Sequence, residues 1–396
     1  MSMKYWVFLF MITLCSFVSA ELTTAEEVNV SNSDQLRRIL ADARPGLTIL
    51  LAKGEYQAGL YADDLNGTEE KPITIRAADP ANRPVIRNGK TGIHISRASH
   101  LILDGLEIDQ ISGNGINLDD GGEKGGKSHH ITLRNIDVRN AGTMGGNLDG
   151  IKISGVDQFS VERCRVVGWG STGSAIDMVG CHQGEILDCF FQAGVSNQGT
   201  GVQAKGGSAD IAIRGCRFEE AGSRAVNIGG STGLPYFRPE NANYEAKRIT
   251  VEDSLFIGSH SPIVFVGIDG AKVSHNTIIN PGKYVVRILQ ETRGERFVAC
   301  RAGVFERNLV VYDPVKVASS TNVGQGTDPG SFQFRGNAWV SRTGRGRIRH
   351  EIASEDDLRL ESVVFEDEAV GDFRPKQRSS PPKVGARQMT VLQGIR

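Results

Sequence analysis

FSVERCRV, at residues 159–166, returns about once every 25 residues with changed letters but the same pattern. Its other copies are EILDCFF (185–191), IAIRGCRF (211–218), ITVEDSLF (249–256), KVSHNTII (272–279) and VFERNLVV (304–311). Each copy alternates apolar and polar residues, passes through a small polar or thiol residue, and resumes with apolar ones. A repeat of this length is typical of a solenoid, in which similar units stack on one another.

The pattern inside each unit identifies the units as strands. Apolar residues recur with a period of two rather than 3.6, which excludes helical repeats. A second strand precedes each copy, as in NGINLD (114–119), DGIKIS (149–154) and SAIDMV (174–179). Two or three short strands per turn, each stacked on its counterpart in the next turn, predict an all-β parallel β-helix.

The small residue of each copy predicts one column that points into the core. Aligned on it, the copies read Asn135, Cys164, Cys189, Cys216, Ser254, Asn276, Asn308 and Asn337, with Asp104 opening the series. Stacked strands are about 4.8 Å apart, whereas the two Cβ atoms of a disulfide are about 3.8 Å apart. We therefore expect the three cysteines to form a buried stack of free thiols.

The two ends of the chain lack the repeat. Residues 1–20 end in small residues after a short apolar stretch, which predicts a signal peptide cleaved after Ala20 and a secreted or periplasmic protein. In the segment 33–46, Ser33 is expected to cap a helix that covers the first coil and stops at Pro45. The β-helix domain is expected over 21–353, followed by a terminal turn and mobile tail over 354–396.

The charge balance narrows the possible partners. The chain has 45 basic and 46 acidic residues, so it lacks the excess of positive charge that would predict binding to nucleic acid. No stretch after the signal peptide is long and apolar enough to predict membrane insertion. We expect a monomer whose partner is recognised by local clusters of charge.

The first strand of each coil is expected to present polar residues on a common outer face. One outward column reads His94, Asn117, Lys152, Asp177, Gln203, Asn227 and Arg287, and the next reads Ser96, Asp119, Ser154, Val179 and Lys205. Eight residues from these columns and their neighbours are expected to converge on one charged patch: Asp119, Asp120, Asp149, Lys152, Asp177, Gln203, Lys205 and Asn227. The alternative is a set of ordinary cross-strand charge pairs, each worth about 0.2–1 kcal/mol.

Two long interruptions flank this patch, at 119–130 and 229–247. Loops inserted on one face of a repeat array often build its binding site. The second loop carries Tyr236, Phe237 and Arg238, a combination suited to stacking on a sugar ring and holding a carboxylate. The alternative is that the aromatic residues only anchor the loop.

The N-terminal third resembles a known group of proteins. PGLTILLAKGEYQAG (45–59), GTEEKPITIRAADPANRPVIRNG (67–89) and LILDGLEI (101–108) are similar to the start of right-handed, single-stranded parallel β-helix proteins of the chondroitinase B and alginate lyase type, in the pectate lyase-like superfamily. GDFRP (371–375) is similar to their closing phrase. The resemblance implies β-elimination on an acidic polysaccharide by a lysine base, an arginine and Ca²⁺.

Residue by residue, the resemblance carries over only in part. Lys205, in VQAKGGSADIAIRGCRF, is similar to the family's lysine phrase and is the expected base. The strand expected to bring the arginine reads RAVNIGG, with Asn227 in the outward place, so Arg238 or Lys152 is expected to assist. The remaining expected roles are Ca²⁺ binding by Asp119, Asp149 and Asp177, and substrate binding by Asn117, Gln203, Asn227, Tyr236, Phe237 and Arg287.

Other functions stay open at this stage. NLDGIKI (147–153) is similar to a phrase of polygalacturonase-like hydrolases, with Asp177 as the only partner for Asp149. An inverting hydrolase needs two carboxyl groups roughly 6.5–9.5 Å apart. A hydrolase or uronate epimerase, and a non-catalytic glycan-binding protein using the same face, are therefore the alternatives.

Overall fold

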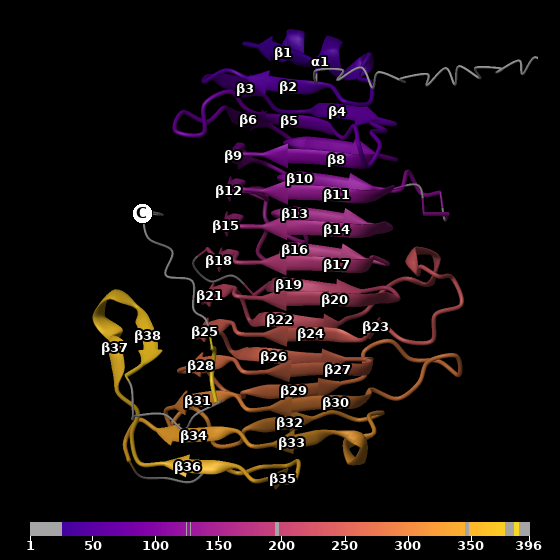
Figure 1. Ribbon diagram of the computed structural model, residues 1–396. Helices are drawn as coiled ribbons and strands as arrows, with labels where there is room; N and C mark the ends of the chain where they lie inside the picture. The colour runs from indigo at the N-terminus through magenta and orange to yellow at the C-terminus, as the bar shows by residue number, and fades with distance from the viewer. Residues whose placement is uncertain are drawn as a thin grey trace, which may run out of the picture.

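The computed structural model describes residues 26–123, 125–126, 128–194, 198–344, 348–376 and 384–387. The chain winds into a column of coils that runs from the indigo N-terminal end to the yellow C-terminal end in Figure 1. Each full coil gives one strand to each of three parallel sheets, here called A, B and C. The predicted parallel β-helix is confirmed. The predicted signal peptide lies outside the described residues.

Sheet C carries the outward columns predicted from the sequence. Its strands are β4 (Leu60–Asp63), β7 (Ile93–Ser96), β10 (Ile116–Asp119), β13 (Ile151–Ser154), β16 (Ser174–Val179), β19 (Thr200–Lys205), β22 (Arg224–Gly229), β26 (Ser261–Val266), β29 (Val286–Leu289) and β32 (Thr321–Val323).

Sheet A follows sheet C in each coil. Its strands are β1 (Glu27–Val30), β2 (Thr48–Leu51), β5 (Ile73–Ala77), β8 (Ser99–Asp104), β11 (Ser128–Arg134), β14 (Val156–Glu162), β17 (His182–Leu187), β20 (Ser208–Arg214), β24 (Ile249–Glu252), β27 (Asp269–Ser274), β30 (Arg301–Glu306), β33 (Gln333–Arg335) and β35 (Ser354–Glu355), and β23 (Ala246–Lys247) pairs with β20.

Sheet B completes the coil. Its strands are β3 (Glu55–Gln57), β6 (Val85–Gly89), β9 (Glu107–Ile111), β12 (Asp137–Arg139), β15 (Arg165–Val167), β18 (Phe190–Gln192), β21 (Arg217–Glu219), β25 (Leu255–Ile257), β28 (Thr277–Ile279), β31 (Leu309–Tyr312), β34 (Ala338–Ser341) and β36 (Leu358–Leu360). Short 3-10 helices lie at Leu234–Tyr236, Pro329–Ser331 and Glu368–Val370.

Alternating apolar residues fill the space between the sheets. Ile93, Ile116, Ile151 and Ile176 are register partners in successive coils of sheet C, and all four are buried. Because side chains alternate across a strand, the residues between them point outward. The inward assignment made from the sequence is confirmed for this sheet, whereas Asp177 and Asn227 of the outward column are buried.

The inward column between sheets A and B begins later than predicted. Arg134 pairs with Glu162 in the register of β11 and β14, so Ile136 rather than Asn135 stacks on Cys164. Asn135 occupies the preceding corner, where its φ is 54°. Asn and Gly tolerate this left-handed conformation better than most residues. Asp104 is likewise a sheet A residue that pairs with Arg134, so it does not open the column.

From Cys164 onward, the predicted column is confirmed. Cys164, Cys189 and Cys216 are buried and free of disulfides. Further along, Asn308 donates from Nδ2 to Asn337 Oδ1 at 3.1 Å, and Asn276 donates to Asn308 in the same way at 3.0 Å. This amide ladder satisfies polar groups that would otherwise cost free energy inside the core.

Helix α1 (Ser33–Ala41) covers the first coil, as predicted. Its N-cap is Asn32 rather than Ser33, because the Asn32 side chain accepts the backbone N–H of Gln35 at 3.0 Å. Leu36 and Leu40 are buried against the first coils. Among the described residues, no helix is long and apolar enough to cross a membrane.

The C-terminal end continues beyond residue 353. Strands β35 and β36 extend sheets A and B. The antiparallel hairpin of β37 (Phe365–Asp367) and β38 (Asp372–Pro375) then packs on the outer face of sheet B, beside β28 and β31 in Figure 1. In the predicted tail, residues 384–387 also lie against the coils, since Arg387 forms a bidentate ion pair with Asp253.

Candidate functional site

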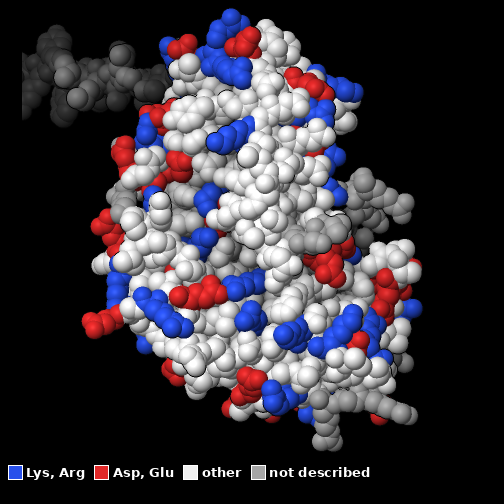
Figure 2. All heavy atoms as spheres, turned by 180° about the vertical axis from the view of Figure 1, so that it is seen from behind, with Lys and Arg blue, Asp and Glu red and all other residues white. Residues whose placement is uncertain are grey.

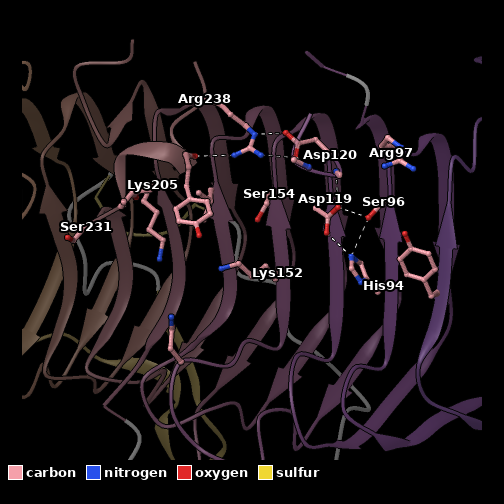
Figure 3. A pocket seen from close by; sticks show the side chains of 18 residues that line it. His94, Ser96, Arg97, Asp119, Asp120, Lys152, Ser154, Lys205, Ser231 and Arg238 are labelled. Atoms are coloured by element: carbon pink, nitrogen blue, oxygen red, sulfur yellow. Dashed lines mark hydrogen bonds and ion pairs between the residues drawn. The ribbon is translucent and has the colours of Figure 1, made fainter. Parts of the chain in front are cut away.

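A groove of ≈ 680 Å³ runs across the outer face of sheet C, between this sheet and the loop that follows β22. Figure 3 shows side chains from several successive coils pointing into it. The residues that line it are Tyr61, His94, Ser96, Arg97, Asp119, Asp120, Gly121, Gly122, Asn147, Lys152, Ser154, Val179, Lys205, Ser231, Thr232, Gly233, Tyr236 and Arg238.

Two lysines share a buried carboxylate in the floor of the groove. Lys205 Nζ lies 3.1 Å from Asp177 Oδ1, and Lys152 Nζ contacts Asp177 Oδ2. Lys152 Nζ is also 3.4 Å from Asp149 Oδ2. The Asp149 and Asp177 side chains are only 2% and 1% exposed. The aspartates thus lie beneath the groove and hold both lysines in it.

Burial and charge set the protonation of this group. Burial would lower the pKa of Lys152, but Asp177 and Asp149 outweigh it and raise that pKa. Burial would raise the pKa of Asp177, but Lys205 and Lys152 lower it overall. For Asp149, burial and then the charge of Asp177 raise the pKa to about 6. Lys152 is therefore a permanent ammonium group, suited to holding a carboxylate.

A second polar cluster lies toward the N-terminal end of the groove. His94 Nε2 is 2.7 Å from Asp119 Oδ2, and Ser96 Oγ donates to Asp119 Oδ1 at 2.6 Å. Burial would raise the pKa of Asp119, but hydrogen bonds from Ser96, the Gly121 amide and His94 lower it overall. Asp119 is thus an ionised carboxylate that orients the imidazole of His94.

The sequence interpretation missed His94 and Tyr61 as site residues. His94 belongs to the outward column that contains Asn117 and Lys152, and Tyr61 is its register partner in the preceding coil. The Tyr61 ring lies edge-on to the His94 ring, with centroids 5.2 Å apart. The period-two pattern therefore contained the signal for both residues.

The loop after β22 forms one wall of the groove. Arg238 makes a bidentate ion pair with Asp120, with Nη2 2.7 Å from Oδ1 and Nε bonded to Oδ2 (Figure 3). Its side chain passes two corner glycines at positive φ: a Cβ on Gly155 would lie 2.6 Å from Arg238 Nε, and one on Gly180 would lie 2.7 Å from Arg238 Cβ. Glycine at these corners makes room for the arginine.

The aromatic residues of this loop have separate roles. Tyr236 is 64% exposed and lines the groove. Phe237 is 0% exposed and packs 5.3 Å from the ring of Phe297, with the Arg296 guanidinium 4.8 Å from its centroid. Phe237 therefore anchors the loop, and its burial corrects the expectation that it contacts a substrate.

The other expected substrate-binding residues are spread more widely. Asn117 donates to Asp119 Oδ2 at 2.9 Å, and Gln203 accepts from Lys205 Nζ at 3.3 Å. Asn227 is buried and donates to the Gly229 carbonyl, which corrects its expected place on the surface. Arg287 donates to Asn322 at 3.0 Å and does not line the groove.

The three aspartates expected to bind Ca²⁺ do not form a common coordination site. The only group of three or more His, Cys, Asp or Glu with ligand atoms close together, in the part of the chain that the structure describes, consists of histidines. Asp119 is not brought together with Asp149 and Asp177, and the last two are paired with lysines. Ca²⁺ takes six to eight oxygen ligands, so these three residues do not fit it.

The sequence matches no family model and no curated protein sequence. Solved structures resemble it in fold. An alginate lyase from Paenibacillus sp. str. FPU-7 superposes with a TM-score of 0.50 at 15% identity, over 78% of this chain and 99% of that one. The chain has the right-handed parallel β-helix fold.

Two lyases of the PL6 family show the same likeness. The polysaccharide lyase Pedsa3628 from Pseudopedobacter saltans has a TM-score of 0.50 at 12% identity, over 91% of this chain and 99% of that one. The alginate lyase AlyGC has a TM-score of 0.51 at 11% identity, over 92% and 57%. The expected right-handed parallel β-helix architecture is thereby confirmed, and at these identities the likeness shows the fold alone.

Proposed function

We propose that this chain binds an acidic, uronate-containing polysaccharide along the sheet C groove and cleaves it by β-elimination. The observation that carries the proposal is the pair of lysines, Lys152 and Lys205, presented side by side in the groove by a buried aspartate. Support comes from the β-helix structures described above, which are named as alginate or polysaccharide lyases.

The elimination requires three groups: a cation, a base and an acid. A cation binds the uronate carboxylate and makes the neighbouring C–H more acidic. A base then removes that proton, the C–O bond to the leaving sugar breaks, and a C=C bond forms beside the carboxylate. An acid returns a proton to the leaving oxygen. Lys152, held as an ammonium group, is suited to the first task, and the phenol of Tyr236, on the wall of the groove, is suited to the last.

Lys205 is the proposed base, because its Nζ lies in the floor of the groove, 3.1 Å from Asp177 Oδ1, on the other side of that carboxylate from Lys152. His94 is too far from Lys205 to act on the same glycosidic bond. Their strands, β7 and β19, are four coils apart in sheet C, or about 19 Å. His94 and Tyr61 are therefore assigned to binding a more distant sugar unit.

The experiment is an assay of the full chain against a panel of uronate glycans, following the ultraviolet absorbance of the unsaturated product. Lys205→Ala is expected to abolish elimination while glycan affinity changes by less than about tenfold, or about 1.4 kcal/mol, because a base acts mainly in the transition state. Lys272→Ala, which removes a lysine paired with Glu306 on sheet A, is the matched control.

Two outcomes would redirect the assignment. Full activity in Lys205→Ala, with loss in His94→Ala, would move the chemistry to the other end of the groove. Binding of glycans by the wild type without any unsaturated product would replace the lyase by a glycan-binding protein. That alternative is favoured by one observation, that both groove lysines are engaged in ion pairs. Hydrolysis has less support, because Asp149 and Asp177 are buried beneath the groove.

A further inference from the structure

Three histidines gather on the outer face of sheet A, outside the groove. His100 lies in β8, and His129 and His130 lie in β11, the next strand of the sheet. None of them lines the sheet C groove. We propose that these three imidazoles, here called the histidine cluster, bind one divalent transition-metal ion of the Zn²⁺ type.

The backbone brings the three rings together. His129 is in register with Ser99, and one residue later His100 and His130 both take positive φ, 48° and 54°. Such an irregularity in a strand re-aims its side chains. As a result, the rings of His100 and His130 stack with centroids 4.5 Å apart and planes at 11°, while His129 lies edge-on to both.

The distances between the ring nitrogens suit a single ion. One ligand nitrogen from each ring lies within 4.8 Å of the others, and the Nδ1 atoms of His129 and His130 are 2.8 Å apart. Zn–N bonds of about 2.0–2.1 Å at tetrahedral angles place ligand nitrogens about 3.4 Å apart. We expect rotations of the side chains to bridge this difference.

A carboxylate lies on the strand next to the histidine cluster. Asp157 is the register partner of His129 in β14, and its Oδ1 is 2.7 Å from His182 Nδ1. This carboxylate offsets part of the charge of an ion bound one strand away.

The donor set indicates which ions bind. Imidazole nitrogen suits Zn²⁺, Ni²⁺, Cu²⁺ and Co²⁺, whereas Ca²⁺ and Mg²⁺ prefer oxygen. Since His130 is exposed, a fourth position is open to water. An ion held by both strands joins two successive coils, so it stabilises the folded chain over the unfolded one.

The test uses the full chain, purified without a histidine tag and stripped with a chelator. Titration with Co²⁺ is expected to produce visible d–d absorption that saturates at one ion per chain and is displaced by Zn²⁺. His129→Gln and His130→Gln are each expected to weaken the affinity at least tenfold. His260→Gln, an exposed histidine outside the cluster, is expected to leave it unchanged.

A second measurement separates binding from folding. Zn²⁺ is expected to raise the midpoint of thermal unfolding of the wild type and of His260→Gln, but not of His130→Gln, whose exposed side chain is the least disruptive to replace. Absence of saturable Co²⁺ binding in the wild type, or equal binding and equal stabilisation in all variants, would overturn the proposal. Neither readout depends on lyase activity.

Discussion

At the scale of single residues, the buried carboxylates beneath the groove have opposite pKa shifts. Asp149 has a pKa raised to about 6, while that of Asp177 is lowered. A carboxyl group whose pKa is higher in the folded state favours folding when protonated and loses this contribution as the pH rises. A carboxyl group with a lowered pKa favours folding when ionised. The two residues therefore make opposite contributions to the pH dependence of stability.

The Asp149→Asn variant is expected to become increasingly more stable than the wild type as the pH rises from about 4 to above 6. The wild type loses roughly 3 kcal/mol over this window as Asp149 ionises, whereas the amide does not ionise. Urea unfolding at pH 4, 5, 6 and 7 measures the difference. Asp177→Asn is the control, and it is expected to be destabilised at neutral pH and to approach the wild type in acid. A pH-independent difference for Asp149→Asn would contradict the assignment.

At the scale of elements, the ion pair between Arg238 and Asp120 ties the groove wall to a distant coil. Asp120 is buried, so removal of Arg238 leaves its carboxylate charge without an ionic partner. Glu245 secures the other end of the loop, where it accepts the backbone N–H of Gly206 at 2.8 Å and of Thr232 at 2.9 Å. The wall is therefore a fixed part of the site.

Arg238→Ala and Asp120→Ala are each expected to destabilise the protein by about 3–5 kcal/mol, the usual cost of breaking a buried pair. The double variant is expected to lose much less stability than the sum of the losses in the two single variants, because neither charge is then left without its partner. Chemical unfolding of the four proteins completes the cycle, and limited proteolysis within 229–247 reports on the loop. Additivity within about 0.5 kcal/mol would show that the two residues are not coupled.

The sequence predicted the strands and the groove columns well, because alternation and register together fix which side chains point outward. It failed where alternation stops. Asn135 lies one residue before the predicted column, since a left-handed corner adds a residue that belongs to neither face. Within the loop, no periodicity distinguishes exposed Tyr236 from buried Phe237. The pairing of Asp177 with two lysines also depends on side-chain reach, which a residue pattern does not encode.

At the scale of the whole molecule, charge is spread without a dominant sign. Figure 2, which views the face opposite to that of Figure 1, shows basic and acidic side chains interspersed. This agrees with the net charge of −1 at pH 7. Attraction of a polyanion thus depends on the few cations in the groove, and salt is expected to weaken it less steeply than it weakens binding to an extended basic surface.

The C-terminal hairpin also acts on the molecule as a whole. Arg217 of β21 donates from Nη1 to the Gly371 carbonyl at 2.8 Å, and Arg342, next to β34, forms an ion pair of 2.9 Å with Glu368. Phe365 and Phe373 pack over the strands between them. One short segment therefore contacts coils that otherwise touch only their immediate neighbours.

Truncation after residue 361, which removes the hairpin together with the ion pair of Arg387 with Asp253, is expected to broaden the thermal unfolding transition or divide it into two steps, while the N-terminal coils keep their stability. Calorimetry of the truncated and full chains measures this, with Val370→Ser, an exposed residue of the hairpin, as a control. A single sharp transition in the truncated chain, shifted as a whole, would contradict it.

The physical reason lies in the one-dimensional nature of a solenoid. A solenoid whose coils contact only their neighbours can unfold from an open end, one coil at a time. The hairpin packs across several terminal coils and makes their unfolding cooperative, because none of these coils can unfold until the hairpin has dissociated. Resistance to fraying in this molecule is thus set by a segment that contributes no strand to the column.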